Sequence, residues 1–544
     1  MTPVSLLVLV AVATSPLLAS VSGIVQHATT GAAIAGAQVR LQTTTGPIAI
    51  SAADGSFTLP VTFTGTRTVT ASVPYDALAF TNYNSAGVEG VADGQSGVLI
   101  QLEAIPSTSG DPLALPTASF CGGCHDAHFA QWQTSQHATA AVDAWVLDLF
   151  SGTGTAGGSA GYVFKNTHDP GASGFCATCH AALEDVSNPG NVLLDAVSAP
   201  AALDGVGCLT CHSIDSVNAN ASALHHLGNS TYRFPDEPGA SPWRFVWGPL
   251  PDVAIVMRNA ESAVFEHPRL CGSCHEYNNP STNAPGQTTY SEWQASPYAV
   301  PGPAYRACQD CHMRGALAPG PISLFGTPIR PGDQRHVHDF VGATPSQLGS
   351  AITLLASAAE VAGQIRVEAQ VENQSGHAFP TGISIRNALL VVSATRAGVP
   401  LAQSSGPTIP FWADDDIPGQ QPGDYSGQPG KGFARVLEGR INGTGPVVRP
   451  VLFIDAENVF SNTLIPSGQA DSSTVTFAFP PGAQAGDVID VSVRLLYRRA
   501  FRATAVIKGW TQTPQGGPIE IQVAQQQFQV TLSTPVVLDS FRIE

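Results

Sequence analysis

The stretch Cys121-Gly-Gly-Cys124-His125 carries the pattern that decides how the centre of this chain folds. Two cysteines three positions apart, followed at once by a histidine, occur four more times along the sequence. The five copies use every one of the ten cysteines, which are Cys121, Cys124, Cys176, Cys179, Cys208, Cys211, Cys271, Cys274, Cys308 and Cys311. A disulfide framework would not require such fixed short pairs, so the spacing itself needs a chemical reason.

The spacing is the one required for covalent attachment of haem. The two thiols can add to the two vinyl groups of one haem, and the adjacent histidine then reaches the iron as the proximal ligand. Paired C-x-x-C units also bind structural zinc, but zinc does not require a histidine after the second cysteine. With 15 histidines in 544 residues, five such histidines would arise by chance about once in 10⁸ sequences. We therefore predict five covalently bound haem c groups, whose proximal ligands are His125, His180, His212, His275 and His312.

Ten histidines outside the motifs compete for the second axial position of the irons. Beyond the initiator, the only methionines are Met257 and Met313, which cannot complete five haems. Most haems are therefore expected to be bis-histidine haems, at the low end of the potential range. The distal candidates are His137, His168, His226, His338 and His377, with His225, His267 and His336 as weaker alternatives.

The segment from His125 to His137 contains no glycine or proline and is predicted to be helical. Twelve helical residues span roughly 18 Å, whereas two ligands of one iron lie about 4 Å apart. His137 is therefore predicted to bind a haem other than the one held by His125. His128, one turn after His125, is expected to lie beside the proximal ligand or in solvent.

An internal repeat follows two of the motifs. The pattern aromatic-x-x-Trp-Gln-x-Ser-x-x-Ala occurs after the first motif, from Phe129, and after the fourth, from Tyr290. We infer a duplicated haem-binding unit, in which Tyr298 takes the place of His137. The motif starts are separated by 55, 32, 63 and 37 residues, and this alternation favours haems arranged in pairs.

These patterns resemble a known group of proteins. The motif followed by aromatic-x-x-Trp-x-x-Ser-x-His-Ala is similar to that of the tetrahaem electron acceptors of hydroxylamine oxidoreductase and related multihaem cytochromes. Further similar runs are Gly205–His212, Cys308–Met313, His338–Gly342 and Gly376–Gly382. The resemblance covers about 118–385 and implies electron transfer, with distal ligands from His137, His338 and His377. This chain differs in its fifth motif and its large β regions, so the partner cannot be carried over.

Both flanks of the motif region alternate apolar and polar residues, as strands do. The N-terminal flank resembles the carboxypeptidase regulatory-like β-sandwich in runs such as Asp54–Leu59, and a second sandwich is expected towards the C-terminus. The fold class is therefore multidomain, with an N-terminal β-sandwich, a central haem-packed domain of short helices and loops, and a C-terminal β-sandwich. The predicted divisions are a signal peptide at 1–20, the regulatory-like sandwich at 21–104, a linker at 105–117, a pentahaem cytochrome c domain at 118–349, and a β-rich domain supplying a haem ligand at 350–544.

Composition limits the partners. The net charge of −17 and the lack of a basic run argue against nucleic acid. The apolar segment Val4–Leu18 suits a signal peptide, which predicts a periplasmic or extracellular protein, and no later segment suits a transmembrane span. The Gly/Pro loop at 404–450 carries Asp414, Asp415 and Asp416, where a solvated acidic loop is favoured over a calcium site.

The leading functional prediction is an electron carrier without enzymatic activity. Its haems would pass electrons to or from another redox protein or an extracellular acceptor. One alternative is a nitrite or hydroxylamine reductase-like enzyme, which would need a haem with an open face. The usual clue for that class, lysine in place of a proximal histidine, is absent from all five motifs. The other alternative is self-association into an extracellular cytochrome filament.

Overall fold

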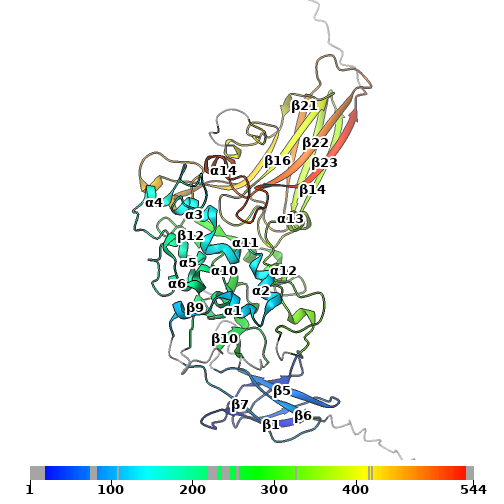
Figure 1. The fold of residues 1–544 in the computed structure, drawn as a ribbon. Helices are drawn as coiled ribbons and strands as arrows, with labels where there is room; N and C mark the ends of the chain where they lie inside the picture. The colour runs from blue at the N-terminus through cyan, green and yellow to red at the C-terminus, as the bar shows by residue number, and fades with distance from the viewer. Residues whose placement is uncertain are drawn as a thin grey trace, which may run out of the picture. The chain divides into compact units, whose positions relative to one another are not determined.

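The computed structural model describes residues 19–73, 83–106, 110–218, 230–235, 245–252, 257–324, 328–414, 417 and 421–533. These residues divide into two compact units. The first contains the N-terminal strands together with residues 245–252 and 257–262, and the second contains the rest (Figure 1). The candidates His225 and His226, the residues Asp415 and Asp416, and nearly all of the expected signal peptide lie outside the described residues.

Two small sheets form the N-terminal part of the first unit. One has the strand order β4-β1-β7 and the other the order β3-β2-β5-β6. Strand β7 alternates buried and exposed residues, and its buried Val98, Ile100 and Leu102 pack in the apolar core that both sheets share. The strands are β1 (Val21–His27), β2 (Gln38–Leu41), β3 (Ala49–Ile50), β4 (Ser56–Leu59), β5 (Thr66–Ser72), β6 (Ala86–Ala92) and β7 (Val98–Leu102).

An excursion from the motif region belongs to this first unit. Strands β10 (Phe245–Gly248) and β11 (Arg258–Glu261) pair in parallel. The amide of Ser85 donates a 2.8 Å hydrogen bond to the carbonyl of Asn259, which ties the excursion to the N-terminal strands. The expected domain at 118–349 is therefore interrupted in space, a feature that no local sequence signal indicates.

The motif region of the second unit consists of short helices and loops. Each motif overlaps a helix of four or five residues. The second, third and fifth motifs form α5 (Cys176–His180), α8 (Cys208–His212) and α12 (Cys308–His312), whereas the first and fourth begin at the end of α1 (Ala118–Gly122) and α10 (Arg269–Gly272). The apolar cluster packed beside β8 (Ile214–Val217) has only three fully buried members. Other elements are α3 (Ala144–Phe150), α4 (Phe164–Thr167), α6 (Ala182–Asp185), α7 (Pro200–Leu203), β9 (Ser230–Tyr232), β12 (Glu276–Asn278) and β13 (Pro285–Thr288).

The helix expected from His125 to His137 is shorter than predicted. Helix α2 (Asp126–Gln133) ends one turn early, and a 3-10 turn (His137–Val142) follows. The hydroxyl of Thr134 donates to the carbonyl of Gln131 at 2.8 Å, and the hydroxyl of Ser135 donates to that of Trp132 at 2.7 Å. These side chains compete for the carbonyls that would continue the helix, so the segment turns before His137.

The C-terminal part of the second unit is a β-sandwich. Its sheets have the orders β14-β15-β21-β18 and β20-β19-β16-β22-β23, with β17 beside β16. The expected multidomain fold class is confirmed. Strand β16 is almost continuously buried because the inter-sheet core covers one face and a second apolar cluster covers the other. The strands are β14 (Ile352–Val361), β15 (Gln364–Asn373), β16 (Asn387–Arg396), β17 (Val399–Pro400), β18 (Gln403–Ser405), β19 (Gly430–Glu438), β20 (Asn458–Asn462), β21 (Ala470–Ala478), β22 (Val488–Arg498) and β23 (Glu520–Thr531).

A buried lysine joins this sandwich to the motif region. Lys508, at the end of α14 (Arg502–Lys508), is only 1% exposed. Its ammonium group donates to the carbonyls of Asp148 at 2.9 Å, Gly158 at 2.5 Å and Tyr162 at 2.6 Å. A buried charge is tolerated only when it is fully hydrogen-bonded in this way. Sequence reasoning missed this joint, because Lys508 lies far along the chain from its three acceptors.

In the described part of the chain, no helix is both long and apolar enough to cross a membrane. In the acidic loop, the Asp414 carboxylate accepts a hydrogen bond from the amide of Ser426 and lies 3.7 Å from Arg498. A protein cation and an amide therefore already face Asp414, the one described residue of the three consecutive aspartates.

Candidate haem-binding sites

The proximal histidines are oriented as iron ligands require. A metal-binding imidazole usually donates its other ring nitrogen to a carbonyl, which fixes the tautomer and frees Nε2 for the metal. Three proximal histidines have Nδ1 on a backbone carbonyl: His125 on Ile322 at 2.8 Å, His180 on Ala140 at 2.8 Å and His312 on Val341 at 2.7 Å. The side-chain amide of Gln287 lies 2.9 Å from Nδ1 of His275. An amide nitrogen donates, so Nδ1 of His275 accepts at the fourth motif, and the residues present fit haem iron at three motifs on this geometry.

The cysteine thiols of different motifs converge. None of the ten cysteines forms a disulfide in the structure. The hydrogen bond with Cys121 and burial hold the pKa of Cys208 above its usual range. The hydrogen bond with Cys308 similarly raises the pKa of Cys271, and the one with Cys179 raises that of Cys274. The attachment points of the first and third, fourth and fifth, and second and fourth motifs are therefore adjacent.

The internal repeat is built identically around its two aromatic side chains. In the first copy Phe129 of α2 packs so closely on Gly122 that a Cβ there would lie 2.6 Å from the ring. In the second copy Tyr290 of α11 (Thr289–Gln294) packs on Gly272, where a Cβ would lie 2.8 Å from the ring. The glycine inside each motif is therefore required by the aromatic residue of the repeat. The predicted duplication is confirmed at the level of side-chain packing.

The repeated tryptophans link the motifs in pairs. The indole of Trp132 donates a 2.8 Å hydrogen bond to the carbonyl of Val206, two residues before the third motif. The indole of Trp293 donates an equally long bond to the carbonyl of Arg306, two residues before the fifth. Each copy thus holds two motifs, the first with the third and the fourth with the fifth. The second motif lies between the first and the third in the sequence, and its Cys179 is hydrogen-bonded to Cys274 of the fourth motif.

Three histidine pairs have the centroid separation of axial ligands, and one of them, His125 and His128 at 6.2 Å, joins residues only three positions apart at the start of α2. Two iron–nitrogen bonds of about 2 Å, plus about 1 Å from each nitrogen to its ring centre, separate axial imidazole centroids by about 6 Å. The rings of His137 and His275 lie 6.2 Å apart, and those of His312 and His377 lie 6.4 Å apart. His377 is placed by the loop after β15 in the C-terminal sandwich. Two of the distal candidates therefore face a proximal histidine.

Burial keeps these imidazoles neutral. Desolvation, followed by the nearby histidines, lowers the pKa of His137 to about 4 and that of His275 to about 3. Burial also lowers the pKa of His377. Nδ1 of His137 is buried without a hydrogen-bond partner. Because iron binds the unprotonated ring, these groups are prepared for ligation at neutral pH.

A third cluster brings His338 towards the third motif. The Nδ1 of His338 donates to the carbonyl of His336 at 2.9 Å, and burial, followed by the charges of His128 and His212, lowers its pKa to about 3. The rings of His128 and His338 touch edge to face at 4.8 Å, which is too close for two ligands of one iron. His338 is thus placed near the proximal His212. His336 has its own Nδ1 on the carbonyl of Met313 at 2.5 Å.

Two other candidates are placed as hydrogen-bonding groups. His168 has Nε2 2.8 Å from the carboxylate of Asp455 and Nδ1 3.0 Å from the hydroxyl of Thr167, so both ring nitrogens are engaged. The buried Asp455 competes for the nitrogen that iron would need, and the distal-ligand role of His168 stays a prediction. The Nδ1 of His267 accepts the amide of Arg269 at 3.0 Å, as a local cap does.

A buried network that sequence reasoning missed surrounds Asp455. Besides His168, its carboxylate accepts the hydroxyl of Tyr162 at 2.8 Å and the amide of Asn442 at 2.7 Å. Burial, and then the charge of Asp455, raise the pKa of Tyr162 far above its usual value. No local sequence signal could have found this network, because its members lie almost 300 positions apart.

Five thiol pairs, each followed by a histidine and lying on or beside a short helix, are typical of multihaem c-type cytochromes. The family model described as cytochrome c554 and c-prime matches residues 120–213. The fold is similar to that of the crystal structure of a penta-haem cytochrome c552 from Thermochromatium tepidum, with 18% identity and a TM-score of 0.51. That similarity covers 77% of this chain and 100% of the other. A search of curated proteins found no match.

Proposed function

We propose that this chain is a pentahaem c-type cytochrome that carries electrons to or from another redox protein or an extracellular acceptor. Its haems are covalently bound through the ten motif cysteines, and most have two histidine ligands. The expected signal peptide supports a periplasmic or extracellular location. A fully ligated iron exchanges electrons without binding substrate, which suits a carrier.

The observation that carries this proposal is the placement of distal histidines opposite proximal ones. His137 faces His275 across 6.2 Å, and His377 faces His312 across 6.4 Å. The nearby charge of His212 supports His338 as the third distal ligand. In this assignment His137, which lies in the first copy of the repeat, binds the iron of the fourth motif, which lies in the second copy. One protein ligand therefore connects the two copies.

The adjacent thiols support a continuous electron route. The hydrogen bond between Cys121 and Cys208 would bring the edges of the first and third haems together. Cys179 of the second motif and Cys308 of the fifth are hydrogen-bonded to cysteines of the fourth motif. The charge of Cys211 also acts on the thiols of the fourth motif, which supports a connection from the third haem to the fourth. The fourth haem would then be the branch point of the route.

A reductase-like enzyme is the second candidate, and one observation favours it. His180 makes no ring contact with another histidine among the described residues, and His168 is engaged by Asp455. The haem of the second motif could therefore keep an open face for a small substrate such as nitrite or hydroxylamine. Catalysis there would require acid or base groups poised at that face.

The two candidates separate in one set of experiments on the haem-loaded protein. Intact mass should exceed that of the processed chain by five haems, and electron paramagnetic resonance should count the low-spin and high-spin irons. The reduced protein is then mixed with nitrite or hydroxylamine. We expect at most slow, stoichiometric oxidation, together with fast, salt-dependent electron exchange with a redox partner. Rapid turnover with a high-spin resting haem would overturn the carrier assignment.

A further inference from the structure

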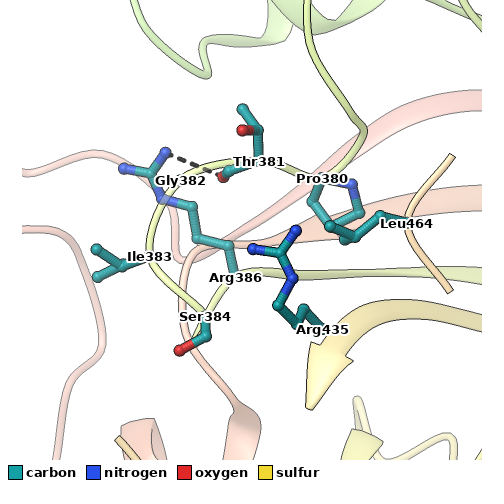
Figure 2. Close-up of a pocket in the computed structure, with 8 residues that line it drawn as sticks. All are labelled: Pro380, Thr381, Gly382, Ile383, Ser384, Arg386, Arg435 and Leu464. Carbon is teal, nitrogen blue, oxygen red and sulfur yellow. Dashed lines mark hydrogen bonds between the residues drawn. The ribbon is translucent and has the colours of Figure 1, made fainter. Parts of the chain in front are cut away.

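A small pocket lies where the loop after His377 enters β16. It is lined by two arginines, Arg386 and Arg435, and by residues of the Pro380–Ser384 loop with Leu464 (Figure 2). In Figure 2 both arginine side chains extend along the pocket. Part of the loop belongs to the run Gly376–Gly382, in which only His377 has so far received a role.

The two arginines differ in their partners. Arg435 is paired: its guanidinium contacts the Glu292 carboxylate at 3.2 Å and the Thr288 hydroxyl at 2.5 Å. Glu292 is itself saturated, because its oxygens also accept the hydroxyl of Thr381 at 2.6 Å and other donors. The carboxylate in this cluster is therefore committed to Arg435, and one positive charge remains uncompensated.

That charge belongs to Arg386. Its one hydrogen bond is a 3.4 Å contact from Nη1 to the carbonyl of Thr381, drawn as a dashed line in Figure 2. Across the described ranges, no acidic side chain forms an ion pair with Arg386. A half-buried guanidinium with five donors and a single long hydrogen bond is poorly satisfied by the protein. It is therefore suited to an acceptor that the polypeptide does not supply.

Space for this guanidinium is kept open by a glycine. Gly382 has φ of +97°, and a Cβ at this position would lie 2.5 Å from Nη1 of Arg386. Any side chain here would both strain the backbone and displace the arginine. The loop thus combines a left-handed glycine with a free cation, which indicates a position shaped for Arg386.

The charge of this cation reaches both proposed axial pairs. The charge of Arg386 acts on His275 of one pair and on His377 of the other. A haem held by either pair carries two propionate carboxylates, and the planar fork of arginine matches a carboxylate with two parallel hydrogen bonds. The haems are the nearest source of such an acceptor once the proposed function is accepted.

We propose that Arg386 binds a propionate of a haem held by the fourth or fifth motif, in the pocket beside the loop that follows His377. This inference rests on the proposed function. It assigns a role to the second half of the Gly376–Gly382 run: His377 supplies the iron ligand, and Gly382 makes room for the arginine that holds the carboxylate. The pairing stabilises the reduced haem, because a compensated propionate adds less negative charge near the iron.

The test is a redox titration of the five-haem protein followed by electron paramagnetic resonance, with R386Q, R386K and R366Q compared to the wild type. In R386Q we expect the reduction equilibrium of one haem to shift about tenfold towards the oxidised form, equal to 59 mV for one electron. R386K keeps the charge without the fork and should shift less. Arg366 pairs with Glu368 on the exposed face of β15, so R366Q is the charge-matched control and should change nothing.

The outcomes are decisive because haem content is measured first. Five low-spin haems with unchanged potentials in R386Q would overturn this inference and leave the proposed function intact. Fewer than five haems in the wild type would instead refute the proposed function. If R386Q does not accumulate, an R386K protein with all potentials unaltered overturns the inference.

A free anion is the rival occupant, and a separate arm tests it. Wild type and R386K are titrated with acetate and with nitrite. We expect no shift of any haem potential, because a covalently tethered propionate already occupies the pocket. A saturable shift in the wild type that R386K weakens would mean that the pocket takes a free anion, and would overturn the propionate assignment.

Discussion

The two copies of the repeat share a scaffold but differ in one ligand. In both, an aromatic ring covers the glycine of a motif, and a tryptophan indole donates 2.8 Å to the carbonyl two residues before the next paired motif. At the end of the repeat the first copy has His137, which faces the fourth motif. The second copy has Tyr298, whose hydroxyl donates 2.9 Å to the carbonyl of Gln374.

The difference shows how a duplicated haem unit changes its ligands without changing its frame. Tyr298 anchors the loop that carries His377, and His377 faces the fifth motif in place of a repeat histidine. In the proposed assignment, the C-terminal sandwich supplies a haem ligand. The contacts that keep the two copies alike are local, whereas the proposed distal ligands come from residues outside the copy whose haem they bind.

Removing the sandwich ligand should have the largest effect. In H377A we expect one of the five haems to change from low-spin to high-spin while all five remain attached, because the fifth motif loses its facing histidine. Electron paramagnetic resonance and intact mass measure both quantities. H168A is the matched control and should leave the low-spin count unchanged, because His168 is bonded to Asp455. A converted haem in H168A, or none in H377A, contradicts the assignment.

Acid should lower the free energy of unfolding, because the buried candidate ligands are neutral in the folded protein. The folded pKa values of His137, His275 and His338 are lowered to about 4, 3 and 3, whereas an unfolded histidine titrates near 6.5. Below pH 6.5 the unfolded chain gains protons that the fold excludes, so stability is complete above this pH and falls with acidification. The slope is at most about 1.4 kcal/mol per pH unit for each histidine. Denaturant unfolding at pH 7, 6 and 5 measures it, and stability that rises towards pH 5 would refute the account.

Replacing the glycine under the aromatic ring should lower the free energy of unfolding by similar amounts in the two copies. We expect G122A and G272A each to lower the free energy of unfolding by about 1–3 kcal/mol, because the new methyl group overlaps the ring of Phe129 or Tyr290. Chemical denaturation gives the values. G122A combined with F129L should cost less than the two single changes together. As a control, G123A should cost less than G122A, since the nearest atom would lie 3.2 Å away.

Removing the tryptophan hydrogen bonds should have the smallest effect on the free energy of unfolding, and the effect should differ between the two copies. W132F removes an indole donor from the carbonyl of Val206 in a side chain only 6% exposed, and should cost about 1 kcal/mol. W293F removes the equivalent bond, but Trp293 is more exposed and water can replace the donor, so the cost should be smaller. Equal or reversed costs from denaturation curves would show that the copies are not buried differently.

Local patterns in the sequence were enough to predict much of this molecule. The cysteine spacing indicated haem attachment, and the repeated aromatic and tryptophan positions indicated a duplication that the packing of Phe129 and Tyr290 confirms. Alternating strands predicted the sandwiches. These features depend on residues near one another in the chain, where spacing determines geometry.

Long-range features could not be predicted in the same way. The helix towards His137 ends early because hydroxyl groups compete for its carbonyls, a balance that composition does not reveal. His168 is engaged by Asp455, which is 287 positions away. The pairing of the first motif with the third depends on the Trp132 hydrogen bond to Val206, and sequence intervals favoured a different partner.

The most direct test of the central claim is a crystal structure of the haem-loaded protein, with irons located by anomalous scattering. The account predicts one iron with a nitrogen of His137 and a nitrogen of His275 on opposite faces, each at about 2 Å. That result would establish that a ligand of the first copy completes a haem of the second. An iron bound by both His125 and His137, or His137 bound to no iron, would contradict it.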